Sequence, residues 1–308
     1  MIDTPPRPDE IVWLPDDPTG FRYVADPFAI VRDHRLTVFV EAFDYRDRRG
    51  EIHYFQYDAD DRLIDQGLAL AEPFHLSYPG LVVDGDELFM LPEGHKSGAL
   101  HLYRCIRFPD RWERLPEPVL RAPAIDASVV RHGDRWWMFY ALPGPGDRAM
   151  RELHVAHAEV LTGPWIQHAA NPVARGFAQG RPGGTAFEID GRLHLPIQDC
   201  SSTYGAAIDL LRIDTLTPDV FGATVIRRFE PGHLLAGYGN GLHTLSGDDT
   251  VTCIDVKSIR TSPAEGWIKA QYKVRRLLGL TRPRRRPVTD AATPRPQRAA
   301  PARSMGLS

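Results

Sequence analysis

The sequence predicts an all-β protein, a five-bladed β-propeller, and two observations lead to this fold class. First, a pattern of about fifty residues recurs five times, each copy having a polar start, an apolar stretch, a tight turn and an aromatic-rich second strand. Second, apolar and polar residues alternate with the period of strands, whereas helical periodicity is nearly absent before residue 260. Strand repeats of this length are typical of propellers, whose blades surround a central channel. An irregular β-sandwich is the alternative that turn spacing alone also allows.

The five copies follow one another along the chain. The hairpin sequences VDGDEL, RHGDRW and IDGRL place Gly and Asp where tight turns need them. The innermost strands of a propeller start near the same end of its channel, so residues at the start of each copy are expected to line one axial pocket. The copies begin with ADPF near Asp26, SYPG near Tyr78 and Pro79, AIDA near Asp126, RPGG near Arg181 and GLHT near His243.

Composition indicates a globular protein of a reducing compartment. The chain has 308 residues, 43% of them hydrophobic, which is enough apolar material for a core. Its three cysteines, Cys105, Cys200 and Cys253, lack CxxC spacing, so neither a disulfide framework nor a cysteine zinc site is predicted. The N-terminus is acidic and proline-rich, and no run of eighteen apolar residues occurs. We therefore predict a cytoplasmic protein, with a peripheral location at the inner face of the membrane as the alternative.

Charge divides the chain into an acidic body and a basic tail. Eleven Lys and Arg residues and one acid follow residue 268, although the whole chain carries a net charge of only −3. An acidic body argues against a nucleic-acid partner, because phosphate contacts need a basic surface. We predict three regions: a lead-in at residues 1–20, the propeller at 21–260 and a tail at 261–308.

The tail is expected to begin with one helix. Ser262-Pro263-Ala264-Glu265 is a capping box with proline at the first helical position, and Gly279 is a stop, which together predict a helix over 263–278. The basic stretch TRPRRRP and a Pro/Ala-rich disordered end follow. Two interpretations stay open: the helix packs on the rim of the propeller, or residues 263–286 dock on an anionic membrane surface.

The motifs resemble those of known families. The order ADP, YPG, AID, GRPGG and GLH resembles the five-bladed propeller glycosidases of glycoside hydrolase family 43. The resemblance implies a general base at Asp26 and a residue that tunes acidity at Asp126, while Arg181 stands where those enzymes have their acidic Glu. A closer likeness, through YVADPF, HLSYP, LPE, WWMFYA, GPW, NPV, RPGG, QDC, YG and HTL, is to the N-terminal domain of glucosamine inositolphosphorylceramide transferases and to bacterial proteins that carry this domain alone.

The exchange of Glu for Arg181 bears on the chemistry. Cleavage of an ordinary glycosidic bond takes two carboxyl groups, one protonated and one ionised. A guanidinium stays charged and cannot donate that proton, but it suits a phosphate leaving group. Plainer interpretations also hold: Asp26 could cap a turn, Asp126 could accept backbone N–H groups, and Arg181 could join blades through an ion pair.

Substitute acids and ligand contacts can be proposed from their positions. Glu93 in LPEGH and Asp199 in IQDC lie toward the ends of second strands and could replace the missing acid, with Glu41 a weaker third candidate. The aromatic strand of Trp136, Trp137, Phe139 and Tyr140 is expected to pack in the core, with a sugar-stacking role as the alternative. No metal or cofactor is predicted, because HExxH, paired His and P-loop motifs are absent. Predicted substrate-binding residues are Arg181, Tyr78, His75, His243, Gln198 and Tyr204, and the predicted catalytic residues are Asp26, Asp126, Glu93 and Asp199.

These observations predict a carbohydrate-active protein with a sugar or sugar-phosphate ligand. The first hypothesis is glycosyl transfer from a phosphate-activated sugar in surface polysaccharide or glycolipid assembly. The alternatives are a propeller glycoside hydrolase with a relocated general acid and a non-catalytic glycan-binding module.

Overall fold

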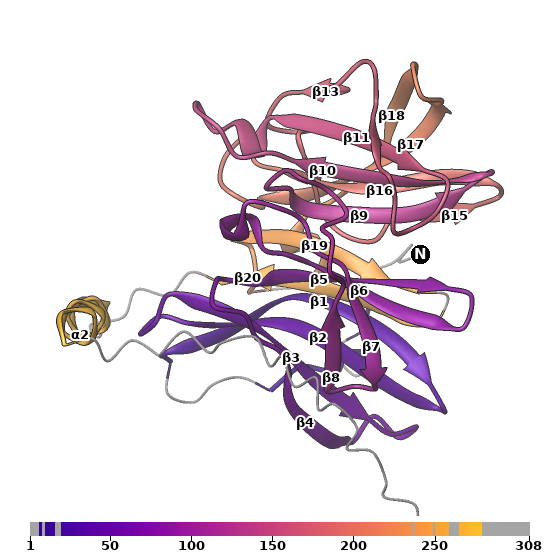
Figure 1. Cartoon of the computed structure of the whole chain (residues 1–308). Coiled ribbons are helices and arrows are strands. Elements are labelled where there is room, and N and C mark those ends of the chain that lie inside the picture. Colours follow the sequence, from indigo (N-terminus) through magenta and orange to yellow (C-terminus); the bar gives the residue numbers. More distant parts are fainter. Residues whose placement is uncertain are drawn as a thin grey trace, which may run out of the picture.

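The alternating stretches of the sequence form strands, and the strands assemble into a propeller (Figure 1). The computed structural model describes residues 6–7, 10–15, 20–235, 237–248, 250–258 and 265–278. In these residues the strands form five sheets, and nearly all pairs within a sheet are between strands that follow one another along the chain. The prediction of an all-β propeller is thereby confirmed.

Four sheets are full blades of four or five antiparallel strands. The first is β1 (Arg22–Arg32), β2 (Arg35–Asp44), β3 (Arg49–Tyr57) and β4 (Leu63–Leu70), and the second is β5 (Ser77–Asp84), β6 (Glu87–Glu93), β7 (Tyr103–Arg107) and β8 (Arg111–Arg114). The third is β9 (Ile125–His132), β10 (Arg135–Ala141), β11 (Glu152–Ala158), β12 (Ile166–Gln167) and β13 (Ala174–Arg175). The fourth is β14 (Arg181–Pro182), β15 (Phe187–Ile189), β16 (Arg192–Asp199), β17 (Ala207–Leu216) and β18 (Phe221–Phe229).

The fifth repeat forms a smaller sheet of two strands, β19 (Gly241–Gly247) and β20 (Thr252–Lys257). The prediction of five blades is therefore corrected: the described residues form four full blades. The reason is in the sequence: the last repeat supplies one alternating hairpin, and the next described element is a helix. The small sheet still lies against β1 and β17, between the first blade and the fourth.

The core lies between neighbouring blades. Side chains of β10 alternate between two apolar clusters: Trp136 and Met138 pack toward the second blade, and Trp137 and Phe139 pack toward the fourth. All four are at most 4% exposed, so this aromatic strand belongs to the core, as expected, and its burial rules out the alternative sugar-stacking role.

Helical elements are few among the described residues: α1 (Pro231–Leu234), α2 (Glu265–Leu277), and the 3₁₀ turns η2 (His95–Ser97) and η3 (Arg148–Met150). Helix α2 confirms the predicted tail helix, while residues 263 and 264 of that prediction and the basic stretch after Gly279 lie outside the described residues. The helix stands beside the first blade (Figure 1), where Arg48 lies over the ring of Tyr272, 4.4 Å from its centre. No described helix has both the length and the apolar character needed to cross a membrane.

Candidate functional site

The first strands of three blades carry the same local distortion. The pairing register shifts between Ala25 and Phe28 in β1, between Ser77 and Gly80 in β5, and at the matching place in β9. At each shift a non-glycine residue has a positive φ: 50° at Asp26, 46° at Tyr78 and 48° at Asp126. A bulge adds a residue and re-aims its side chain, and a positive φ costs an L-residue about 1–3 kcal/mol. Such strain is typical of sites where side-chain direction matters.

The fourth and fifth sheets complete the ring around these residues. His243 lies at the corresponding register shift of β19, between Leu242 and Thr244. In the RPGG motif, Gly184 exchanges two hydrogen bonds with the hydroxyl of Tyr78, at 2.7 and 2.9 Å. A Cβ on Gly184 would lie 1.6 Å from a backbone oxygen of β19, so this close approach requires glycine. The structure thus brings together the residues that the sequence predicted to converge.

Asp26 lies at the centre of the site. Its carboxylate accepts hydrogen bonds from the hydroxyl of Thr244 at 2.7 Å and from the backbone N–H of Tyr78 at 3.2 Å. Burial raises the pKa of Asp26 to about 6, although the nearby charge of His243 opposes that rise. Asp26 is therefore mostly ionised at neutral pH but can take up a proton, which suits a general base.

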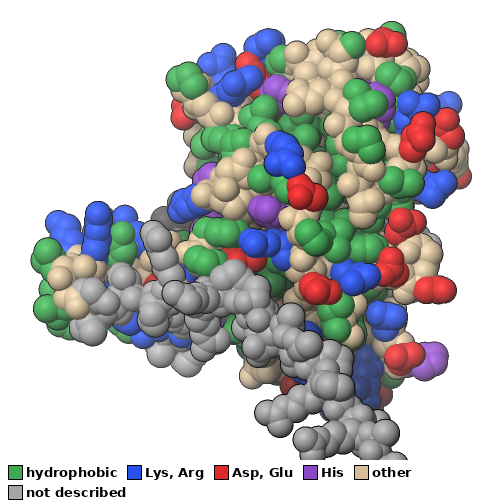
Figure 2. All heavy atoms as spheres, in the orientation of Figure 1, with side chains coloured by type: hydrophobic (Ala, Val, Ile, Leu, Met, Phe, Trp, Pro, Cys, Tyr) green, Lys and Arg blue, Asp and Glu red, His purple; other side chains and the backbone are tan. Residues whose placement is uncertain are grey.

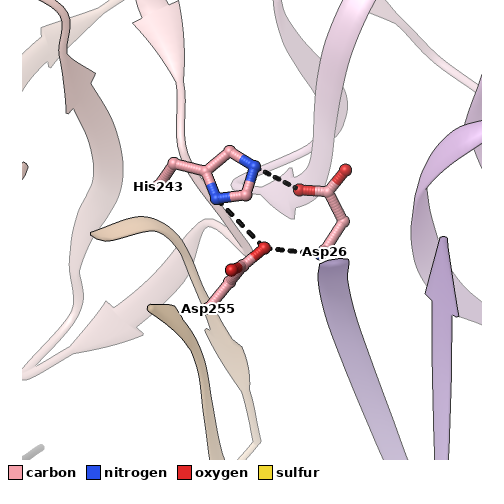
Figure 3. A group of neighbouring side chains, drawn as sticks. All are labelled: Asp26, His243 and Asp255. Atoms are coloured by element: carbon pink, nitrogen blue, oxygen red, sulfur yellow. Dashed lines mark hydrogen bonds and ion pairs between the residues drawn. The ribbon is translucent and has the colours of Figure 1, made fainter. Parts of the chain in front are cut away.

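His243 lies between two carboxylates (Figure 3). Its Nδ1 is 3.0 Å from Asp255 and its Nε2 is 3.4 Å from Asp26. Burial alone would lower the pKa of His243, but Asp255 and Asp26 raise it to about 9. His243 is consequently an imidazolium at neutral pH and helps to keep Asp26 ionised.

Asp126 and Arg181 form a second cluster, supplied by the third and fourth blades. The Nε of Arg181 donates to Asp126 at 2.6 Å, and its Nη2 lies 3.9 Å from Glu93. Burial raises the pKa of Asp126 to about 7; Arg181 opposes this effect and Glu93 adds to it. The guanidinium also donates to the hydroxyl of Tyr204 at 3.3 Å and lies over that ring. Arg181 thus joins the third and fourth blades, and Tyr204 beside it is 38% exposed.

Glu93 is close to the site, but its surroundings favour the ionised form. Burial would raise its pKa, yet hydrogen bonding from His95, at 2.6 Å, and the charge of Arg181 bring that pKa below its usual value. A group that stays ionised is a poor proton donor. The geometry therefore gives Glu93 the role of a charge partner for Arg181.

Asp199 and Gln198 lie side by side at the end of β16 but have different surroundings. Asp199 pairs with Arg228 at 2.6 Å, and hydrogen bonds from Ser201 and Arg228 outweigh burial and lower its pKa. This ion pair argues against the predicted role of Asp199 as the substitute acid. Gln198 is fully buried and donates to Asp126 at 2.9 Å, so it supports that carboxyl from behind.

Glu41 lies on the other flank of Asp26, because β2 pairs with β1 so that Glu41 faces Ala25. Burial, with the charges of Asp26 and Glu93, holds the pKa of Glu41 well above its ordinary value. His75 is 3.5 Å from the Glu41 carboxyl, and burial lowers the pKa of His75 to about 4. The predicted ligand contact at His75 is thus next to the weakest of the three acid candidates.

Sequence reasoning missed several residues of the site. Asp255 pairs with His243, and Thr244 donates a hydrogen bond to Asp26. The sequence signal that could have revealed Asp255 is an acidic residue within the mostly apolar stretch TCIDV. An aromatic cluster of Tyr23, Phe43 and Tyr45 was also missed. Tyr23 stacks on Phe43 at 5.1 Å and Phe43 meets Tyr45 edge-on at 5.4 Å.

Among the described residues, Asp26, His243 and Asp255 have ligand atoms within 4.8 Å of one another, close enough to share a cation. One imidazole nitrogen and two carboxylates are a donor set that zinc accepts. However, both ring nitrogens of His243 face carboxylates, and a proton on the ring satisfies this arrangement without a metal. The absence of a metal stays a prediction.

Comparison with known proteins agrees with the motifs. Residues 15–230 match the family described as glucosamine inositolphosphorylceramide transferase 1, N-terminal. The chain belongs to this family. Glucosamine inositolphosphorylceramide transferase 1 of Oryza sativa subsp. indica is 35% identical over 209 residues, and that of Arabidopsis thaliana is 31% identical over 203 residues, each match covering 65% of this chain. These matches cover 27% and 26% of the two relatives, so the chain spans about a quarter of their length.

Solved structures with a similar fold are propeller glycosidases. A β-xylosidase/α-arabinofuranosidase from a compost microbial metagenome, in complex with xylotriose, has a TM-score of 0.53 at 13% identity and covers 79% of this chain and 92% of its own. An α-L-arabinofuranosidase from Podospora anserina, in complex with cellotriose, has a TM-score of 0.54 at 10% identity, covering 79% and 81%. At such low identity the likeness establishes the fold.

Proposed function

We propose that the protein is a carbohydrate-active enzyme that breaks or transfers a glycosidic bond at the axial site. The observation that carries this proposal is the state of Asp26. It is a buried carboxylate with a pKa of about 6, and it lies at a strained bulge of β1 with a positive φ. Strained backbone and a neighbouring charged partner that shifts a pKa are both features that gather at functional sites. The fifth sheet acts here as a reduced fifth blade, since it supplies His243, Thr244 and Asp255.

The charges of the site favour a neutral saccharide over a sugar phosphate. The two buried cations, His243 and Arg181, are each flanked by two carboxyl groups. A phosphate bound to Arg181 would have to compete with Asp126, whose hydrogen bond to Nε is 2.6 Å long. Transfer from a phosphate-activated sugar is therefore the second candidate function. Family membership favours it, but the carboxyl groups that already pair with Arg181 and His243 do not. Sugar ligands of the structural neighbours, xylotriose and cellotriose, are neutral.

The test is turnover of glycosides by the full chain and by Asp26→Asn. We expect the wild type to hydrolyse or transfer from members of a panel of glycosides and sugar phosphates, and Asp26→Asn to be inactive but folded. Asp65→Asn, on the exposed side of β4, is the matched control and should keep full activity. Sugar binding without turnover by the wild type would favour a glycan-binding module instead.

We also propose that helix α2 attaches the protein to anionic lipid. Arg275 lies 3.7 Å from Asp47, and Tyr272 packs under Arg48, so one face of the helix is held on the first blade. Figure 2 shows basic and apolar side chains next to one another on the part that projects. The exposed apolar residues of α2 and the position after it are Trp267, Val274, Leu277 and Leu278. A basic helix that presents an apolar face in this way is typical of membrane-surface binding.

A further inference from the structure

We propose that Glu41 is the proton donor of the axial site, acting beside Asp26 as the base. This inference rests on the proposed glycosidic chemistry. It gives Glu41 the role of the general acid, which in the family 43 glycosidases belongs to a Glu at the position of Arg181. Glu41 was the weakest of the three candidate acids in the sequence, and the structure places it in the first blade, on the strand next to Asp26. Four features of the structure lead to it.

The first feature is the position of the carboxyl. Glu41 faces Ala25 across the β1–β2 pair, directly before the bulge that re-aims Asp26. Its side chain is 8% exposed, as is that of Asp26. The Oε1 atom is buried and has no hydrogen-bond partner, and Nε2 of His75 lies 3.5 Å from it.

The second feature is the protonation of the neighbouring histidine. The Nδ1 of His75 accepts a hydrogen bond from the backbone N–H of Gly50 at 2.8 Å, so Nδ1 carries no proton and the ring is neutral. His75 therefore brings no positive charge to Glu41. His243 has the opposite surroundings, two carboxylates, and its positive charge lies next to Asp26. One carboxyl thus has a cationic partner and the other does not, which separates their protonation states.

The third feature is that the other two candidate acids, Asp199 and Glu93, already have partners that favour their ionised forms. Asp199 is paired with Arg228 at 2.6 Å, and Glu93 is bonded to His95 at 2.6 Å. Neither carboxyl needs a proton to be stable in its surroundings, whereas a buried Glu41 without a cation does. Burial, together with the charge of Asp26, holds the pKa of Glu41 well above the ordinary range, in agreement with the geometry.

The fourth feature is a surface for a sugar ring next to this acid. Tyr23 and Tyr45 are 37% and 42% exposed, and both belong to the aromatic cluster around Phe43. The pair Tyr23–Phe43 lies two residues from the pair Ala25–Glu41 on the same two strands, so these side chains share one face of the first blade with Glu41. Burial and then the charge of Glu41 raise the pKa of both tyrosines. A rigid aromatic group with a polar edge suits the apolar face and hydroxyls of a saccharide. A saccharide bound on this cluster would lie on the same face of the blade as Glu41.

The proposed step conserves protons. Glu41 gives its proton to the glycosidic oxygen as the bond from that oxygen to the anomeric carbon breaks, and the bonding electrons leave with the oxygen. Asp26 takes a proton from the incoming water or sugar hydroxyl as its oxygen bonds to the anomeric carbon. Glu41 ends ionised and Asp26 protonated, and exchange with solvent restores both.

The first experiment compares leaving groups. Glu41→Gln in the full chain should slow turnover of methyl glycosides about 100-fold, the usual contribution of a general acid. Dinitrophenyl glycosides, whose leaving group needs no proton, should react with little change. The matched control is Glu72→Gln, another buried glutamate, which accepts from Tyr103 at 2.8 Å in the second blade and should behave as wild type. Equal slowing of both substrate classes, or of neither, would overturn the role of Glu41.

The second experiment needs no substrate. Carbon-13 NMR of protein labelled at glutamate carboxyl groups should show one resonance that stays in the protonated position at neutral pH and is missing in Glu41→Gln. If that resonance persists in the variant, Glu41 is not the protonated acid and the inference fails. If the resonance is assigned to Glu41 but no glycoside is turned over, the proposed function fails and the protonation of Glu41 stands.

Discussion

Replacing Asp126 by Asn should abolish the pH dependence that this carboxyl imposes on stability, so the stability of the variant relative to wild type should rise from acidic to alkaline pH. Burial raises the pKa of Asp126 from 3.8 to about 7, so the folded state binds a proton that the unfolded state releases. The contribution of this group to the free energy of unfolding is therefore constant and fully present below about pH 4. It falls as the pH rises from about 4 to about 7, and it is lost above that. Asn has nearly the same shape, can still hydrogen-bond to Arg181, and does not titrate.

The magnitude follows from the two pKa values. One unit of difference is worth about 1.4 kcal/mol, so between about pH 5 and about pH 8 the wild type loses about 2–3 kcal/mol relative to the variant. In a protein of this size each kcal/mol moves the melting temperature by about 2 °C, so the advantage of the variant should grow by about 5 °C over that range. Any constant effect of Asn on Arg181 cancels in this comparison of slopes.

Thermal unfolding of wild type and variant at several pH values measures the effect. Asp60→Asn is the control, because Asp60 lies on an exposed turn with its side chain 69% exposed, and its pH slope should match the wild type. Parallel curves for wild type and Asp126→Asn would refute the reasoning, because they would mean that Asp126 is ionised in the folded protein at all these pH values.

Four further changes test other parts of the site. Arg181→Glu should abolish activity and lower the melting temperature increasingly above neutral pH, because a third carboxyl would join Asp126 and Glu93; a variant as active as wild type would show that the guanidinium has no role. His243→Gln should move the acidic limb of the pH–rate profile to higher pH, because the charge that holds down the pKa of Asp26, now about 6, is lost; an unchanged limb would contradict that coupling. Tyr45→Ala should raise KM more than it lowers kcat, and the reverse pattern would count against a sugar-stacking surface. A chain ending at residue 263 should lose co-sedimentation with anionic vesicles at low salt, and equal recovery of both chains would disprove attachment through α2.

The sequence alone led to the fold and to most of the residues on the axis. Strand periodicity and hairpin motifs are local properties, so the repeat was visible without the structure, and the strand with Trp136 and Trp137 was correctly expected in the core. The repeat also placed Asp26, Tyr78 and Asp126 at equivalent positions, where the structure finds the same bulge and the same positive φ. It overestimated the fifth repeat, because one hairpin was counted as a whole blade.

The tertiary structure alone decided which of the acids carries a proton. Glu41, Glu93 and Asp199 look alike in sequence, since each lies near the end of a second strand. Their protonation depends on partners from other parts of the chain: Arg228 for Asp199, His95 and Arg181 for Glu93, and a neutral His75 for Glu41. Electrostatic energy in a buried site depends on distances of a few ångströms and on the loss of water, and neither is encoded in the spacing of residues along one strand.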